Sequence, residues 1–93
     1  MNNTENKHGP IADLLDMLLQ SMYIGASRYT QECYSAALEQ YNKGDLYNAA
    51  KRAYAGIDHR FGLGSKEWLY ARDLIARAGF HLSYRWNQKE GTR

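Results

Sequence analysis

The chain has very little cysteine and very little proline. Its 93 residues include one cysteine, Cys33, and one proline, Pro10. A single cysteine excludes a disulfide within the chain and suits a reducing compartment. The sequence also lacks a run of β-branched residues alternating with polar ones, which is the pattern typical of a strand. We therefore expect an all-α protein with essentially no β-strand.

Long apolar segments are missing as well. The longest apolar stretch runs from Ile11 to Ile24, contains Asp13 and Asp16, and is too short to span a bilayer. The first ten residues are polar and lack the basic start and apolar centre of a secretory signal. We expect no contact with a membrane and predict a cytoplasmic protein.

The residue spacings that usually accompany metal or thiol chemistry are absent. The three histidines, His8, His59 and His81, are scattered, and no Cys-x-x-Cys or His-x-x-x-His pair occurs. Because metal ligands need such spacings, we expect no metal and no cofactor. Cys33 follows Glu32, whose negative charge would raise the pKa of the thiol, whereas a reactive cysteine needs a lowered one.

Composition and charge indicate one ordinary small domain. Hydrophobic residues make up 44% of the chain and charged residues 24%, which is enough for a modest core. The net charge of +2 is too small to indicate nucleic acid by itself. We expect a single helical domain over residues 10–86, with a disordered arm at 1–9 and a frayed polar tail at 87–93.

Helical periodicity predicts four helices. Apolar residues recur at intervals of three and four between Ile11 and Met22, and again between Trp68 and Leu82. Gly79 would lie inside the last helix, at a cost of about 1 kcal/mol relative to Ala. The helices are expected over about 10–23, 28–43, 46–58 and 66–82, with a glycine-rich loop at 59–64.

The middle of the chain has the features of a helical hairpin. Gly44 is the residue type that takes a left-handed backbone just past a helix end. Asp45 is a preferred cap of the next helix, because its carboxylate accepts bonds from backbone N–H groups. The small residues Ala49, Ala53 and Gly56 would let a neighbouring helix approach closely. The sequence thus predicts a small four-helix bundle with a central antiparallel αα-hairpin.

Small residues in this hairpin have a regular spacing, at Ala37, Gly44 and Ala49. The pattern resembles one helical pair of the tetratricopeptide type, which favours small residues and a glycine-led turn at such positions. Where that repeat has a large aromatic residue this chain has Ala53, and the closing proline is absent. We attribute the likeness to hairpin geometry. As a family relationship it would imply a module that binds a peptide or a protein.

Arg52 and His59 are separated by six residues. The pair is similar to the short Arg/His motif of HEPN-type helical ribonucleases, whose dimers bring two such pairs together. The resemblance implies acid–base transfer by His59 during phosphodiester cleavage and phosphate binding by Arg52. The family frequently has a polar residue after the arginine, where this chain has Ala53. Alternatively, Arg52 belongs to a solvent-exposed face and His59 is favoured at a helix C-terminus.

Basic residues also lie along the last predicted helix and its tail. Arg77, His81, Tyr84 and Arg85 take neighbouring positions, and such a mixture contacts phosphates and stacks on bases in nucleic-acid binders. The plainer interpretation is a salt bridge between Asp73 and Arg77, four residues apart on one helix. We retain an RNA-directed module, a binder or a ribonuclease, as the alternative function.

Aromatic residues are abundant. Eight tyrosines, two tryptophans and two phenylalanines exceed what a core of this size encloses, so some of them are expected at the surface. Tyr, Trp and Arg are enriched where protein interfaces bind most strongly. Our leading expectation is a non-enzymatic interaction protein, an adaptor or inhibitor, that binds a protein partner and can form a homodimer. The candidate contact residues are Tyr47, Arg52, Tyr54, Arg77, Tyr84 and Trp86.

Overall fold

A computed structural model describes residues 9–82, and helices account for most of that range. The described residues contain no strand, and none of their helices combines the length and the apolar content needed to cross a bilayer. The prediction of a small all-α four-helix bundle is confirmed. The helices are α1 (Gly9–Ser21), the 3-10 turn η2 (Met22–Ile24), α2 (Arg28–Asn42), α3 (Leu46–Phe61) and α4 (Lys66–Arg77).

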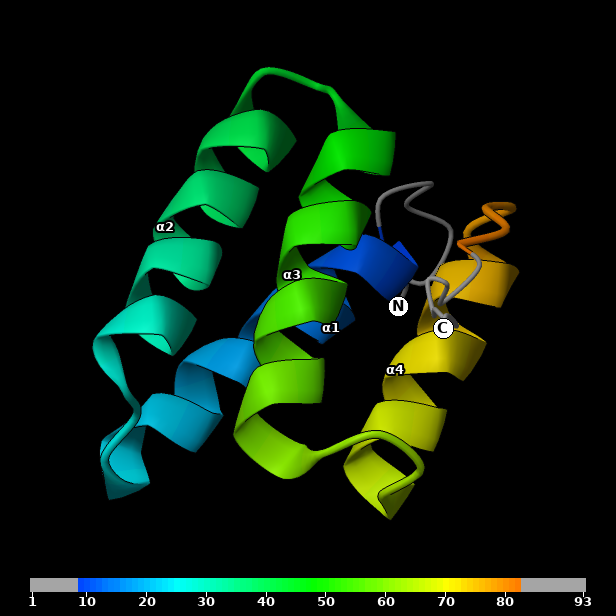
Figure 1. Ribbon diagram of the computed structural model, residues 1–93. Helices are drawn as coiled ribbons and strands as arrows, with labels where there is room; N and C mark the ends of the chain where they lie inside the picture. Colours follow the sequence, from blue (N-terminus) through cyan, green and yellow to red (C-terminus); the bar gives the residue numbers. More distant parts are fainter. Residues whose placement is uncertain (1–8, 83–93) are drawn as a thin grey trace, which may run out of the picture.

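Helices α2 and α3 form the central antiparallel hairpin (Figure 1). Gly44 takes the left-handed backbone, with φ 85°, and its N–H donates to the carbonyl of Tyr41. The N–H of Asp45 donates to the carbonyl of Gln40, which closes the end of α2. The carboxylate of Asp45 then accepts a bond of 3.1 Å from the N–H of Asn48 and so caps α3. Gly44 and Asp45 therefore form the turn that the sequence predicts.

Helices α1 and α4 both pack against α3, and α4 lies on the side of α3 away from α2 (Figure 1). Helix α3 is thus the central element, and its Ala49, Ala50 and Ala53 are fully buried. A Cβ atom added at Gly56 would lie 3.0 Å from Cys33 Cβ and 3.0 Å from Leu18 Cδ2. The close approach expected at Gly56 therefore involves both α1 and α2. The largest buried aliphatic residues are Ile11, Leu14, Leu18, Ile57, Leu74 and Ile75.

The end of α3 differs from the prediction. The helix does not stop before His59 but continues to Phe61, where Gly62 has φ 99° and donates to the carbonyl of Asp58 at 2.8 Å. A basic residue such as Arg60 is favoured in a last turn by the helix dipole. Phe61 packs against the core and holds that turn in place. The predicted loop over 59–64 is consequently shorter, and His59 lies within a regular helix.

The end of α4 differs as well. Gly79 is not inside the helix, because α4 ends at Arg77 and Gly79 has φ 89°. The N–H of Gly79 donates to the carbonyl of Ala76, and the N–H of Phe80 donates to that of Ile75. These two bonds form the closure that a left-handed glycine provides at a helix end. The chain therefore turns at Gly79, and Phe80 folds back against the core.

Candidate functional site

The extension of α3 places Arg52 and His59 on one face of the helix. Seven residues correspond to almost two full turns, so both side chains leave the helix in nearly the same direction. Both residues are exposed. The first turn of α2 faces this part of α3, and it provides the contacts that orient the histidine.

His59 is held by Ser27, the N-cap of α2, and by Tyr29 in its first turn. Its Nε2 atom lies 3.1 Å from Oγ of Ser27, and its ring meets the ring of Tyr29 edge to face at a centroid distance of 4.7 Å. Ser27 is itself fixed, because its Oγ accepts a bond of 3.2 Å from the N–H of Thr30 and caps α2. The imidazole of His59 therefore has a defined orientation although it is exposed to solvent.

Tyr29 is a common neighbour of the basic pair. A hydrogen bond with Cys33 is the main reason that the pKa of Tyr29 is raised, and partial burial adds to this effect. The positive charge of Arg52 acts in the opposite direction and lowers it. Arg52 and His59 thus both act on this tyrosine, one by charge and the other by ring contact. Tyr29 remains 49% exposed, so one side of it is open to a ligand.

Cys33 is not an activated nucleophile. Burial is the main cause that raises the pKa of its thiol, while the hydrogen bond from Tyr29 and the charge of Arg52 lower it. The raised pKa expected from the sequence agrees with the structure. Its cause is mainly burial, and the expected contribution of Glu32 is the smallest of the four. A protonated thiol is a poor nucleophile and a poor metal ligand at neutral pH.

The structure corrects the placement of Tyr54. This residue is 1% exposed, and its ring stacks on that of Trp68 at a centroid distance of 5.6 Å. Its side chain is part of the core between α3 and α4 and cannot contact a partner in this fold. Seven residues earlier, Tyr47 is partly exposed near the other end of α3, where its ring meets Phe80 at 5.6 Å.

The other predicted contact residues do not form one surface. Arg77 lies on α4, and its Nε atom is 3.1 Å from Asp73, so the expected salt bridge is confirmed. Tyr47 contacts Phe80, which follows α4, whereas the charge of Arg52 lowers the pKa of Tyr29 in the first turn of α2. Helices α2 and α4 lie on opposite sides of α3 (Figure 1). Of the remaining candidates, Tyr84 and Trp86 lie outside the described residues, as does Arg85.

A surface that the sequence analysis missed lies at one end of the bundle. Figure 1 shows that η2 and the loop between α3 and α4 are at the same end, opposite the α2–α3 turn. We call this the loop end and define it by Met22–Ile24 and residues 62–65. Its apolar side chains are strongly exposed: Tyr23 at 79%, Ile24 at 74% and Leu63 at 61%. The signal in the sequence is that Tyr23, Ile24 and Leu63 lie outside the apolar stripes of the predicted helices.

The described part of the chain offers no set of metal ligands, since no three His, Cys, Asp or Glu side chains come together in residues 9–82. Comparison with protein-family models, with curated proteins and with solved structures finds no match to this chain. The described residues thus present two candidate surfaces, the Arg52–His59 face and the loop end.

Proposed function

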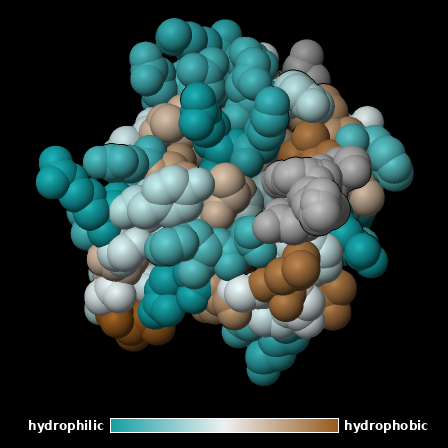
Figure 2. All heavy atoms as spheres, in the orientation of Figure 1, coloured by the Kyte–Doolittle hydropathy of each residue, from teal (hydrophilic) through white to brown (hydrophobic). Residues whose placement is uncertain are grey.

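We propose that this protein is a non-enzymatic interaction module of the adaptor or inhibitor type, which binds a protein partner through the loop end. The observation that supports this proposal most directly is the exposure of Tyr23, Ile24 and Leu63. Single exposed apolar residues are normal, but three large ones on two short connections at one end are a candidate contact surface. In Figure 2 the end around the α2–α3 turn is mostly hydrophilic, and apolar side chains reach the surface near the opposite end.

The exposed apolar side chains of the loop end contribute little to the stability of the bundle. Tyr23 and Ile24 follow α1 and are not among the residues that pack in or against the core. Leu63 occupies the loop between α3 and α4 and is also outside the core. Apolar surface that folding leaves exposed can be buried by binding, with a favourable transfer free energy of about 25 cal/mol per Å². A second copy of the chain is one partner that the same end would accept.

Substitution at the loop end tests the proposal. We expect Ile24→Asp combined with Leu63→Asp to abolish capture of the partner, because an interface core does not tolerate unpaired charge. Tyr47→Asp, at the opposite end of α3, is the matched control and should retain the partner. Loss of the partner in the control but not in the double variant would place the interface elsewhere.

The second candidate function is an RNA-directed module that uses Arg52 and His59. What supports it is the common helix face of the two residues together with the fixed orientation of His59 against Ser27. In this hypothesis His59 transfers a proton during phosphodiester cleavage and Arg52 binds the phosphate. Helix α4 is a weaker site for RNA, since Arg77 is paired with Asp73 and the Arg72 guanidinium lies 5.4 Å from the Trp68 ring.

A cleavage assay without metal tests the enzymatic form of this candidate. We expect His59→Ala to abolish cleavage of single-stranded RNA while the helix content is retained. His81→Ala, which removes another exposed histidine, should leave the rate unchanged. Equal rates for the wild type and His59→Ala would exclude His59 as the catalytic group. For binding alone, contacts to phosphate should weaken steeply with added salt, whereas an apolar interface should not.

A further inference from the structure

The loop end differs in charge from the opposite end of the bundle. Residues 17–31 and 59–66 contain its two connections and the helix turns that adjoin them. With histidine counted as neutral, these residues include three positive charges and no aspartate or glutamate. Asp58 and Glu67, which flank the second segment, are partly buried. Around the α2–α3 turn, in contrast, residues 39–48 contain two carboxylates and one lysine.

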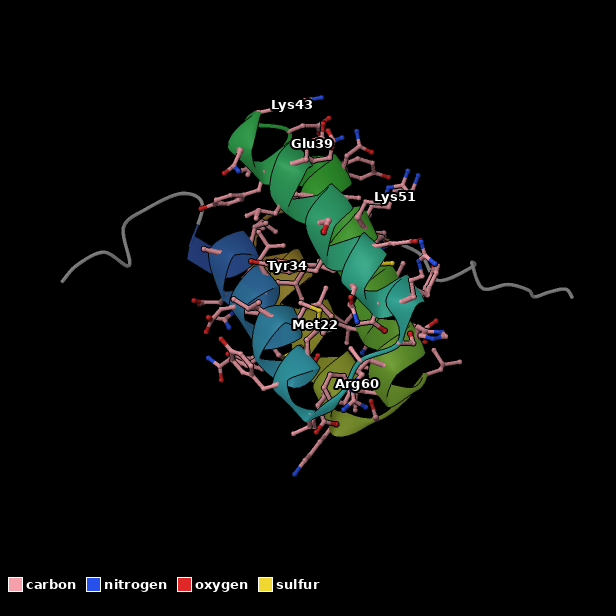
Figure 3. The ribbon with its side chains drawn as sticks, turned by 90° about the vertical axis from the view of Figure 1, so that its left-hand side faces the viewer. Met22, Tyr34, Glu39, Lys43, Lys51 and Arg60 are labelled. Carbon is pink, nitrogen blue, oxygen red and sulfur yellow. The ribbon has the colours of Figure 1, made fainter. Side chains whose placement is uncertain are left out.

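Two of the three basic residues of the loop end are open to solvent. Arg28 is the first residue of α2 and Lys66 the first of α4, and both are exposed. The side chain of Arg28 is 91% exposed, so its 3.3 Å contact with Glu32 is a surface pair of little energetic weight. Arg60 is partly buried and adds charge to the surface. Figure 3 shows Arg60 beside the segment that joins α1 to α2, at the end opposite Lys43.

The apolar surface of the loop end continues onto α4. Leu69 and Tyr70 are 45% and 49% exposed. They follow Lys66 by three and four residues, which are the spacings that make side chains neighbours on a helix. Leu63 lies three residues before the same lysine. The positive charge at the start of α4 is therefore flanked by exposed apolar side chains.

An occupant that matches this surface has apolar groups and negative charge together. A nucleic acid supplies negative charge but would leave the aliphatic side chains of Ile24 and Leu63 uncovered. An anionic membrane supplies both features, but basic clusters that bind lipid usually contain about four to eight Lys or Arg, and the loop end has three. A protein segment with alternating acidic and apolar side chains needs no larger cluster.

We propose that the loop end binds an acidic, amphipathic segment of its protein partner. Apolar side chains of that segment cover Ile24 and Leu63, and its carboxylates face Arg28 and Lys66 at the rim. The inference rests on the proposed function and makes its partner more specific.

Selection from a random peptide library tests this chemistry without assuming a sequence. Peptides of about sixteen residues, which as a helix span about 24 Å, are displayed on phage and selected on the full wild-type chain. The shortest extent of the molecule is 25 Å, so this length suits the end of the bundle. We expect selected peptides to combine net negative charge with several aliphatic or aromatic residues. Selection of neutral or basic peptides, or of none, would overturn the proposal.

Charge reversal on the chain tests where a selected acidic peptide binds. Arg28→Glu with Lys66→Glu should weaken the affinity of the synthetic peptide about tenfold or more, because attraction becomes repulsion. Lys43→Glu with Lys51→Glu is the matched control. It changes the net charge equally, breaks the equivalent i,i+4 pair with Glu39, and lies away from the loop end (Figure 3). Its effect should stay within about threefold.

Equal weakening by the two double variants would indicate diffuse charge and would contradict the assigned surface. Circular dichroism checks that both variants are folded. The affinity of the wild type should also decrease with added salt, and this dependence should be smaller in Arg28→Glu/Lys66→Glu. Affinity that does not respond to salt would count against carboxylates at the rim.

The native partner, captured from a lysate, separates this inference from the proposed function. Loss of the partner in Ile24→Asp/Leu63→Asp and in Arg28→Glu/Lys66→Glu, with retention in the lysine control, supports both. If only the first of these variants loses the partner, the proposed function stands and the acidic segment is excluded. If neither variant loses it, both are overturned.

Two binding measurements test the other occupants. Sedimentation of the wild type with vesicles that contain phosphatidylserine, without binding of acidic peptides, would assign the loop end to a membrane. A dimer in analytical ultracentrifugation that Arg28→Glu/Lys66→Glu abolishes, again without peptide binding, would assign it to a second copy. Either result would refute the proposal, whereas peptide binding by a monomer that ignores the vesicles supports it.

Discussion

Cys33 and Tyr29 share a hydrogen bond that raises the pKa of the phenol and lowers that of the thiol, whereas burial raises both. Both pKa values are raised above their ordinary values of 9.0 and 10.0, by burial first for the thiol and by their shared hydrogen bond first for the phenol. A raised pKa in the folded state means that the folded chain holds its proton more tightly than the unfolded chain does. The free energy of unfolding is therefore expected to fall as the pH rises above the unfolded pKa.

Replacement of Cys33 tests this coupling. We predict that the free energy of unfolding of the wild type decreases between about pH 8 and pH 11, and that the decrease is smaller in Cys33→Ala. Urea unfolding at several pH values measures both slopes. The comparison uses the slope and not the absolute stability, since the variant also changes packing beside Gly56. Identical slopes in the two proteins would contradict the assigned pKa shift.

A second prediction at the residue scale concerns the close packing around Gly56. Gly56→Ala should lower the free energy of unfolding by about 1–3 kcal/mol, because the added Cβ would lie 3.0 Å from both Cys33 Cβ and Leu18 Cδ2. This outcome opposes helix propensity, which favours alanine by about 1 kcal/mol. Gly9→Ala is the matched control, since a Cβ there meets nothing within 4 Å. A more stable Gly56→Ala variant would show that α1 and α2 approach α3 less closely than described.

At the scale of the elements, Gly79 decides how α4 ends. Its φ of 89° is strained for any residue with a Cβ, so Gly79→Ala should lower the free energy of unfolding by about 1 kcal/mol. If the residue lay inside the helix, alanine would instead stabilise the protein by about the same amount. The sign of the change in thermal stability therefore distinguishes the structure from the sequence-based expectation.

The elements also show which features a sequence reveals. The cap at Asp45 depends on residues within one turn, and the sequence predicted it. The ends of α3 and α4 depend on Phe61 and Phe80, which fold against distant parts of the core. Local patterns do not contain that information, so one helix was predicted too short and the other too long.

The same distinction applies to the site. The spacing of Arg52 and His59 is visible in the sequence, but the residues that orient His59 come from a different helix, thirty-two positions away in the case of Ser27. Only the register of the hairpin brings them together. The burial of Tyr54 likewise depends on which side of α3 the last helix covers, since its neighbour there is Trp68.

At the scale of the whole molecule, the two ends of the bundle differ. The α2–α3 turn is polar and closed by its own hydrogen bonds, and the salt bridge from Glu39 to Lys43 lies close to it. The loop end has exposed apolar residues that folding does not use. We therefore propose that the helices provide the stability and that the connections at the loop end bind the partner. Substitutions of Tyr23, Ile24 and Leu63 should change stability by no more than about 0.5 kcal/mol.

Capture of the tagged chain from a native lysate, with and without nuclease, tests the central claim most directly when the wild type and Ile24→Asp/Leu63→Asp are compared side by side. We predict a stoichiometric protein partner that survives nuclease and is lost in the double variant, while the thermal stability of that variant is unchanged. Tyr47→Asp should retain the partner. Capture that collapses with nuclease, or that persists in the double variant, would contradict partner binding at the loop end.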